Sequence, residues 1–283
     1  MKKRLSVILL IAVFLVGLSL LLYPTVSNYV NSLHQSRAIA GYEEGMTKMT
    51  RQDYSAFREA AEEYNRELAQ NSGGFLLPGE DEAEYNSILN PTGTGIMGYV
   101  DVSFIGVKLP VYHGTDEEVL QIGVGHLEGS SLPVGGETSH CILSGHRGLP
   151  SARLLTDLDK LTVGDVFLLH TLDQVLAYKV DQILIVEPED TASLQLEEGK
   201  DYCTLVTCTP YGVNSHRLLV RGVRTEYDAA AMQMLNISAD AEKVDPLLVA
   251  PVLAVPMVFG LLIWLFAGAG GKRTKSGKEQ GRP

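Results

Sequence analysis

Two apolar runs, Leu5–Tyr23 and Leu247–Ala267, constrain this 283-residue chain more than any other feature of its sequence. Each run approaches the roughly 20 residues that a helix needs to cross a bilayer. Three basic residues and no acid accompany the first run, and five basic residues against one acid are found from residue 246 onward. Because short, positively charged ends favour the cytoplasmic side of a membrane, the sequence predicts transmembrane helices at 5–23 and 246–267, with both ends inside and the middle outside.

Each run also has an alternative interpretation. The first could be a cleaved signal peptide, but its apolar stretch exceeds the roughly 7–15 residues usual for such a segment, and no A-x-A-like site precedes Tyr23-Pro24. The second could be a buried helix, but Pro251 and Pro256 are tolerated better in a membrane, and a basic cluster follows them. Two uncleaved anchors are therefore favoured, with basic cytoplasmic segments at 1–4 and 268–283.

The segment between the apolar runs is strongly acidic. Of the 23 Lys and Arg residues and the 34 Asp and Glu residues, the two ends hold eight and one, which leaves 15 and 33 in the middle, a net charge of −18. Such a segment would repel a phosphate backbone, so nucleic acid is excluded as a partner. The hydrophobic content of 45% excludes wholesale disorder and allows a sizeable core.

The middle divides into a helical part and a strand-rich part. A helical extension with a candidate lid connector is predicted over 24–95, because apolar residues recur at three- and four-residue steps before Asn71-Ser-Gly-Gly ends the helix. From Ile96 onward, short apolar runs separated by Gly, Pro and Asp predict a β-barrel or sandwich over 96–226. A helix-like insertion is expected at Ser151–Leu161, and a stalk at 227–245. The apolar face of the extension comprises Tyr54, Phe57, Ala61, Tyr64 and Leu68.

Cys208 is the strongest candidate for a reactive side chain. The chain has three cysteines, too few for a disulfide framework, so at least one thiol is free. Cys208 ends a strand that Pro210 breaks, and the returning strand brings Arg217 beside it. A neighbouring cation stabilises the thiolate, which is the nucleophilic form. Cys141 and Cys203 lie within apolar strands and are expected to be buried core side chains.

A thiol nucleophile usually works with a histidine that is distant in sequence and close in space. Among the seven histidines, His146 is the best candidate, because Cys141-Ile-Leu-Ser-Gly-His-Arg-Gly is an apolar strand that ends in glycine-flanked polar residues. No cofactor or metal is expected. The Gly-rich stretch around His126 lacks the spacing of a dinucleotide loop, and neither a C-x-x-C pair nor a D-x-D-x-D-G loop occurs.

Several segments form one connected pattern over roughly residues 96–226. Its main parts are Ser144-Gly-His-Arg-Gly, Val206-Thr-Cys-Thr-Pro-Tyr-Gly-Val-Asn and His216-Arg-Leu. Its further parts are Met97-Gly-Tyr-Val, Leu109-Pro-Val-Tyr-His-Gly-Thr, Gly123-Val-Gly-His-Leu-Glu-Gly-Ser-Ser-Leu-Pro-Val-Gly-Gly and Thr156-Asp-Leu-Asp-Lys-Leu. This pattern resembles the sortase family, and in particular its pilus-building class C. The anchors at both ends and the N-terminal helical extension also fit that class.

The resemblance implies an eight-stranded β-barrel that acts as a cysteine transpeptidase without a metal. Carried over by motif, Cys208 is the nucleophile, His146 the catalytic histidine and Arg217 the stabilising arginine. The enzyme would cleave an LPxTG-like sorting signal between Thr and Gly through a thioester. It would then join the Thr carboxyl to a Lys amine of another pilin subunit, on the outer face of the membrane of a Gram-positive-type cell.

Two alternatives to that activity stay open. One is a sortase that attaches surface proteins to peptidoglycan. The other, from a different class, is a catalytically inactive interaction domain tethered to the membrane.

One feature departs from the class C pattern. Such relatives commonly carry an Asp-Pro-aromatic tripeptide that marks a lid over the active site, and residues 24–95 contain none. The nearest candidates are Phe75-Leu-Leu-Pro-Gly and Asn90-Pro-Thr. Either the connector covers the site through other contacts or the lid is absent. The aromatic residue and the prolines slightly favour a variant lid.

Overall fold

The computed structural model describes residues 2–70, 82–226, 256–258 and 260. The chain forms two compact units, residues 1–241 and 242–283, and the helices and strands named below belong to the first. The predicted stalk at 227–245 and most of the predicted second transmembrane helix at 246–267 lie outside the described residues. Residues 71–81 of the predicted connector also lie outside them.

The first helix, α1 (Lys2–Thr47), contains the predicted anchor at 5–23. Over Ile11–Thr47 it is long and apolar enough to cross a membrane by length and composition alone, a test that a signal sequence also passes. Its apolar side chains here are exposed, Leu20 at 71% and Leu21 at 62%, so α1 is not the core helix of a globular domain at this end. The helix therefore suggests a membrane anchor or a signal.

Two further helices, α2 (Arg51–Gln70) and α3 (Glu82–Ser87), precede the barrel. α2 begins with a capping box: the Thr50 N–H donates to the Asp53 carboxylate at 2.8 Å, and the Asp53 N–H donates to Thr50 Oγ1 at 3.3 Å. The apolar face predicted for this segment is confirmed. Ala61 and Leu68 are buried, and the three aromatic residues of the face are partly buried against the core.

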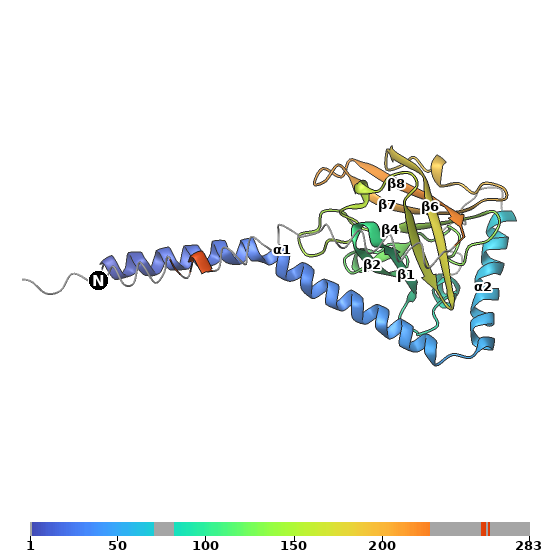
Figure 1. Cartoon of the computed structure of the whole chain (residues 1–283), viewed down its shortest axis with the longest axis horizontal. Helices are drawn as coiled ribbons and strands as arrows, with labels where there is room; N and C mark the ends of the chain where they lie inside the picture. Colours follow the sequence, from blue (N-terminus) through green and yellow to red (C-terminus); the bar gives the residue numbers. More distant parts are fainter. Residues whose placement is uncertain (1, 71–81, 227–255, 259, 261–283) are drawn as a thin grey trace, which may run out of the picture. The chain divides into compact units, whose positions relative to one another are not determined.

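The barrel is closed by eight strands in the order β1-β2-β3-β4-β7-β8-β6-β5. Figure 1 labels β1, β2, β4, β6, β7 and β8 of this barrel. The β2–β3 and β4–β7 pairs are parallel, and the other neighbours are antiparallel. This confirms the predicted eight-stranded barrel with an N-terminal helical part. The strands are β1 (Ile96–Val102), β2 (Val107–His113), β3 (Val124–His126), β4 (Ser139–Ser144), β5 (Val166–Thr171), β6 (Gln174–Val186), β7 (Asp201–Thr209) and β8 (His216–Thr225).

The helix-like insertion predicted at Ser151–Leu161 is wrong. This segment consists of turns and a short 3₁₀ helix, η2 (Leu158–Lys160), and Leu154 has a φ of 39°, which is incompatible with an α-helix. The four leucines of the segment are nevertheless buried in the core. Their spacing reflects burial from successive turns and not a helical period.

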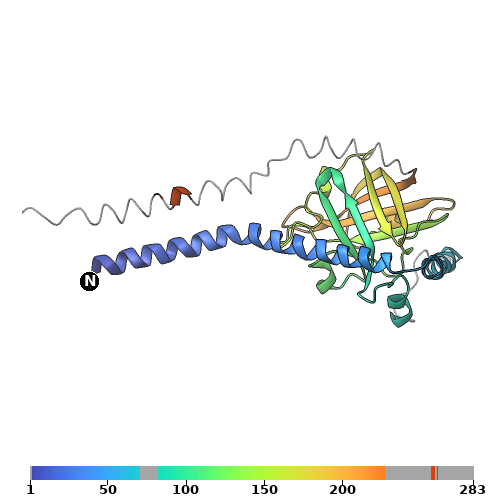
Figure 2. The ribbon, with the colours of Figure 1, turned by 60° about the horizontal axis from the view of Figure 1, so that its bottom comes forward.

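The C-terminal half of α1 runs alongside the barrel and contacts β1 and β2 (Figure 2). Tyr42, on the buried stripe of α1, connects the helix to two parts of the barrel. Its hydroxyl donates to the Met97 carbonyl at 3.1 Å and accepts from the Leu172 N–H at 2.8 Å. The helix is therefore fixed to the barrel by hydrogen bonds as well as by apolar contact.

Strands β4, β7, β8 and β6 lie side by side and have two different faces. Leu205 of β7 and Val220 of β8 point into the core of the barrel. Val206 and Leu219, their next neighbours in sequence, belong to a separate apolar cluster on the outer face. Because side chains alternate along a strand, this outer face also receives Cys208, and it carries the candidate site.

Candidate active site

Cys208 and Arg217 face each other across two antiparallel strands. They are register partners near the end of β7 and the start of β8. Side chains directly opposite each other in such a pair have Cβ atoms about 4.5–5.5 Å apart. The Cys208 thiol is free and partly exposed, and Arg217 Nη1 donates to the His216 carbonyl at 3.2 Å. The cation expected beside Cys208 is therefore on the adjoining strand, at the same level of the barrel.

His146 leaves the same end of the barrel from the neighbouring strand β4. The parallel pairing of β4 with β7 matches Ser144 with Val206, so His146 and Cys208 each lie two residues further on. The ladder continues past the strand, because the Gly145 N–H donates to the Val206 carbonyl at 3.0 Å. The structure thus brings together the ends of three adjacent strands that carry His146, Cys208 and Arg217.

A carboxylate that the sequence analysis did not identify lies beside His146. Glu117 opens the short helix α4 (Glu117–Leu120), and its Oε2 is 3.6 Å from His146 Nε2. A hydrogen bond from Gln121 and the charge of His146 lower the pKa of Glu117. Glu117 is 29 residues from His146 in sequence, and no local signal marks it. Only the packing of α4 against the barrel end brings it to the histidine.

Two loops meet beside the site. Gly148 has a φ of 81°, and a Cβ there would lie 2.9 Å from the ring of Tyr211 in the β7–β8 loop. Glycine is therefore needed both for the backbone conformation and for the close approach of the ring. Arg147 Nη1 donates to Thr209 Oγ1 at 3.2 Å, which links the loop after β4 to the last residue of β7. These contacts fix the loop after β4 relative to the end of β7.

An apolar strip lies on the outer face next to the thiol and the arginine. Val206 pairs with Leu219, and Leu219 pairs with Leu184 of β6, one outward row away from Cys208 and Arg217. Leu194 from the connection between β6 and β7 packs on this strip. The strip therefore provides apolar surface along the strands beside Cys208.

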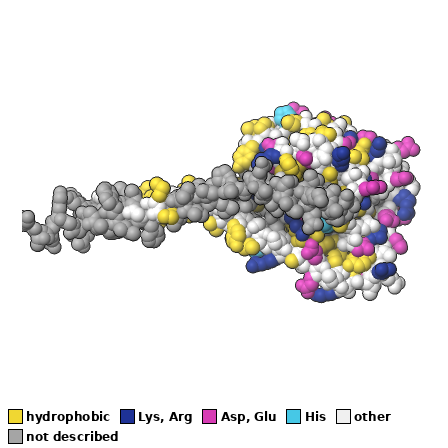
Figure 3. All heavy atoms as spheres, viewed as in Figure 1, with side chains coloured by type: hydrophobic (Ala, Val, Ile, Leu, Met, Phe, Trp, Pro, Cys, Tyr) yellow, Lys and Arg dark blue, Asp and Glu magenta, His cyan; other side chains and the backbone are white. Residues whose placement is uncertain are grey.

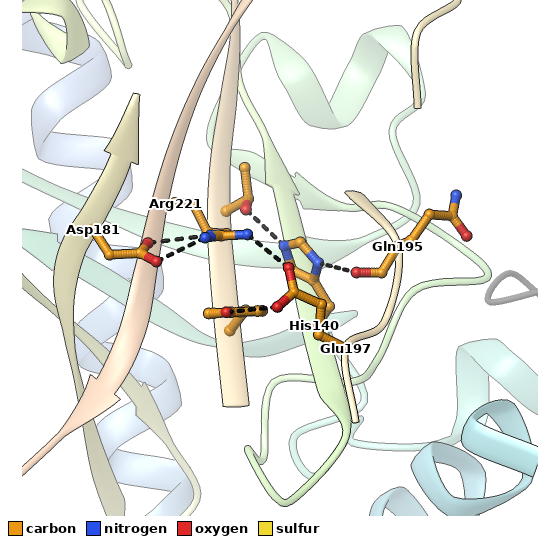
Figure 4. A network of polar contacts seen from close by, with 7 residues as sticks. His140, Asp181, Gln195, Glu197 and Arg221 are labelled. Carbon is orange, nitrogen blue, oxygen red and sulfur yellow. Dashed lines mark hydrogen bonds and ion pairs between the residues drawn. The ribbon is translucent and has the colours of Figure 1, made fainter. Parts of the chain in front are cut away.

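A polar network closes the other end of the strip (Figure 4). Arg221 donates to both carboxylate oxygens of Asp181, at 3.1 and 2.8 Å, and to Glu197 at 3.2 Å. His140 Nδ1 lies 3.0 Å from the Gln195 carbonyl, and burial lowers the pKa of this histidine. Since Gln195 and Glu197 belong to the connection between β6 and β7, the network fixes that connection beside the strip.

The other two cysteines are enclosed by the barrel. Cys141 and Cys203 are register partners on β4 and β7, and both are buried, which confirms their predicted place in the core. Burial raises the pKa of the Cys203 thiol well above its ordinary value. These thiols are therefore shielded from the outer face that carries Cys208.

Metal-ligating side chains do not form a cluster in the described part of the chain. No group of three or more His, Cys, Asp or Glu residues among the described residues is arranged to hold a metal ion. On the face shown in Figure 3, Asp and Glu side chains are scattered among basic and apolar ones. On that face, the acidic side chains are therefore best explained as solvent-exposed surface residues.

One end of the closed eight-stranded barrel thus carries a free thiol, an arginine and a histidine, and comparison with known proteins gives the class to which such a barrel belongs, the cysteine transpeptidases. The sortase domain matches residues 100–225 of this chain. The chain belongs to the sortase family, and its solved structural neighbours are class C sortases.

Two solved structures and one curated sequence illustrate the similarity. Sortase C1 of Streptococcus agalactiae is 52% identical, with a TM-score of 0.65 and coverage of 68% of this chain and 100% of its own. A structure of Clostridium perfringens sortase C with the C-terminal cell wall sorting motif is 41% identical, with a TM-score of 0.60 and coverage of 68% and 100%. Sortase D of Bacillus subtilis (strain 168) is 29% identical over 147 residues, 51% of this chain and 71% of that protein.

Proposed function

We propose that this sortase joins pilin subunits. It cleaves an LPxTG-like sorting signal between Thr and Gly and forms an amide between the Thr carboxyl and a Lys amine of another subunit. The observation that carries the proposal is the register pairing of Cys208 with Arg217 at the barrel end from which His146 also emerges. Similarity to class C sortases supports a pilin as the substrate.

The first half-reaction makes a thioester. The Cys208 thiolate attacks the Thr carbonyl carbon, and a C–S bond forms as the carbonyl oxygen becomes an oxyanion. The Arg217 guanidinium donates hydrogen bonds to that oxyanion, which it reaches from the adjoining strand. The C–N bond to Gly then breaks, and the His146 imidazolium gives its proton to the departing amine. The C-terminal part of the signal leaves with that amine.

The second half-reaction transfers the acyl group. The neutral Lys amine of another pilin attacks the thioester carbonyl, and the His146 imidazole accepts the proton that this amine loses. The C–S bond breaks, Cys208 departs as a thiolate, and the new amide links the two subunits. Covalent catalysis thus divides one difficult displacement into two easier ones and returns the enzyme to its starting state.

The apolar strip supports a sorting signal with an aliphatic residue near the scissile bond. Leu194, Leu219 and Val206 border the surface next to Cys208. Apolar surface removed from water contributes roughly 25 cal/mol per Å². The Leu of an LPxTG-like motif would contact this strip while its Thr carbonyl reached the thiol.

The enzyme is proposed to act at the outer surface of the cell membrane. α1 would anchor it in the lipid bilayer through residues 5–23, and a second transmembrane helix at 246–267 would follow a stalk at 227–245. The basic ends at 1–4 and 268–283 would lie in the cytoplasm, and the catalytic barrel at 96–226 outside. The helical extension and connector at 24–95 would link the first anchor to the barrel.

Intact mass spectrometry with an LPxTG-type peptide tests the chemistry. The protein should gain the mass of the peptide up to Thr, and the adduct should be absent from the Cys208→Ala variant. That variant keeps Cys141 and Cys203, so it is its own control for acylation of other thiols. An adduct that persists in Cys208→Ala, or no adduct in the wild type with any such peptide, would refute the assignment.

The acceptor is tested separately. Incubation with pilin should give an SDS-stable ladder of covalent polymers. A product that carries a single peptidoglycan fragment and forms no ladder would identify instead a sortase that attaches proteins to the wall. A Cys208→Ala cell with unchanged pili and unchanged surface proteins would favour an inactive interaction domain.

A further inference from the structure

Polar side chains of α1 lie on one stripe just beyond the predicted anchor and reach the loops around His146. Asn28, Asn31 and Gln35 are spaced i, i+3 and i+7, so they share one face of the helix. Asn28 Oδ1 accepts from the Arg153 N–H at 2.8 Å. Asn31 Nδ2 donates to the Ser151 carbonyl at 2.7 Å. Both partners are backbone groups of the connection between β4 and β5.

That connection carries His146. The histidine lies at its start, and the Leu155 N–H donates to the His146 carbonyl at 3.2 Å. Ser151 and Arg153 therefore belong to a loop that closes back on His146. When α1 holds these two residues, it holds the backbone from which the imidazole projects.

The third residue of the stripe reaches the other side of the imidazole. Gln35 Nε2 donates to the Ile122 carbonyl at 3.1 Å. Ile122 follows α4, whose first residue, Glu117, lies 3.6 Å from His146 Nε2. The Ile122 N–H donates to the Val119 carbonyl at 3.1 Å. The Ile122 carbonyl that Gln35 binds therefore belongs to the turn of chain that continues α4, the helix that Glu117 begins.

We propose that Asn28, Asn31 and Gln35 are positioning residues for transpeptidation, because they clamp the two backbone segments on either side of the His146 imidazole. This inference rests on the catalytic role proposed above for His146. Asn28 is five residues beyond Tyr23, the last residue of the predicted anchor, which corresponds to about 7.5 Å of helix. The helix that would anchor the enzyme thus also supports its active site.

The two asparagines allow a matched chemical test. The backbone N–H of Arg153 can only donate and the carbonyl of Ser151 can only accept, so the amide orientations of Asn28 and Asn31 are fixed by their partners. Aspartate has the same shape and adds the same charge at either position. It keeps the acceptor that Asn28 supplies but loses the donor that Asn31 supplies, and it leaves two oxygens facing each other there.

The test compares Asn31→Asp, Asn28→Asp and Asn28→Ala in the full chain in detergent micelles, with rates divided by the concentration of Cys208 that acylates. Asn31→Asp and Asn28→Ala should lower kcat about tenfold or more with KM within about a factor of two, since a misplaced catalytic group costs rate and not peptide binding. Asn28→Asp should restore most of the rate lost in Asn28→Ala. Ser36→Ala, at an exposed position next to Gln35, is the control for α1 itself.

Hydrogen exchange on the same proteins tests the clamp independently of activity. Peptides over 146–155 should exchange faster in Asn31→Asp and Asn28→Ala than in Asn28→Asp and Ser36→Ala, while the melting temperature stays unchanged. Equal kinetics and equal exchange in the two aspartate variants would overturn the proposal. If the wild type acylates no peptide, the proposed function fails, and the exchange comparison still decides whether α1 holds the loop.

Discussion

Replacing Tyr42 by Phe should lower the free energy of unfolding by about 2–4 kcal/mol, although it removes a single oxygen atom. That oxygen connects α1 to the barrel at two points, the carbonyl of Met97 and the N–H of Leu172. Met97 lies where the register between β1 and β2 shifts, and Leu172 lies in the β5–β6 turn with a φ of 53°. Both backbone groups depend on the tyrosine rather than on a regular strand partner.

The magnitude follows from burial. Tyr42 is 3% exposed, Met97 is fully buried and Leu172 is 9% exposed, so water does not readily replace the lost hydroxyl. A buried backbone group left without a partner costs about 1–3 kcal/mol. Two such groups, with some relaxation of the turn, give the stated range. The ring is retained, so the apolar contribution of the side chain changes little.

The buried hydroxyl of Tyr42 also makes the difference in unfolding free energy between the wild type and Tyr42→Phe depend on pH. Burial raises the pKa of Tyr42 to about 12 in the fold, whereas an unfolded tyrosine ionises near ~10. Above pH ~10 the unfolded state releases the proton more readily, so the wild type loses stability that the Phe variant does not. By linkage, the difference in unfolding free energy between the wild type and Tyr42→Phe should be smaller by about 1.4 kcal/mol at pH ~11 than at pH ~8.

Urea unfolding followed by far-ultraviolet circular dichroism measures both effects. Tyr29→Phe is the control, because Tyr29 lies on the same helix and is 63% exposed. It should change stability by less than about 0.5 kcal/mol. A Tyr42→Phe protein as stable as that control at pH ~8 would show that the two backbone groups find other partners, and would refute the reasoning.

Two further predictions concern chemistry and acid stability. Arg217→Lys should lower kcat by about 10²–10³, because a point charge cannot replace the planar guanidinium that we propose donates to the oxyanion; equal rates would remove Arg217 from the mechanism. Stability should fall as pH drops below about 6.5, because burial lowers the pKa of His113, His140 and His170 in the fold while unfolded histidine binds a proton near that pH. Thermal melts between pH 7.5 and 5 measure this loss, which should be smaller in His140→Gln; a flat profile would contradict it.

Local patterns in the sequence predicted the parts of the fold that depend on local signals. The apolar period of α2 and the short apolar runs between Gly, Pro and Asp turns lie within short windows of sequence, and the structure has a helix and strands in these places. The order of strands around the barrel does not lie in any window, since β4 and β7 pair in parallel from segments about sixty residues apart. The strand pattern alone was compatible with either a barrel or a sandwich, and only the resemblance to the sortase family indicated that the sheet closes into a barrel.

For the candidate site, too, local sequence predicted some residues, and contacts between distant segments determine the others. Cys208 and Arg217 could be placed together because they flank one turn between adjacent strands. Glu117 and the asparagines of α1 could not be found, because each acts across a long sequence separation. The asparagines, moreover, bond to backbone groups of their partners. Almost any residue can supply a backbone N–H or carbonyl, so the identities of Ser151 and Arg153 do not reveal these hydrogen bonds.

Strand parity explains why two cysteines of β7 have opposite character. Cys203 and Cys208 are five residues apart, an odd number, so alternation puts them on opposite faces of the same strand. Cys203 therefore points into the core, where its thiolate would lack solvation, and Cys208 points to the outer face beside Arg217. A slip of β7 by one residue would exchange these environments and bury the proposed nucleophile. The closed barrel, by fixing the register of β7 on both sides, thus determines which of the two thiols is buried and which is partly exposed.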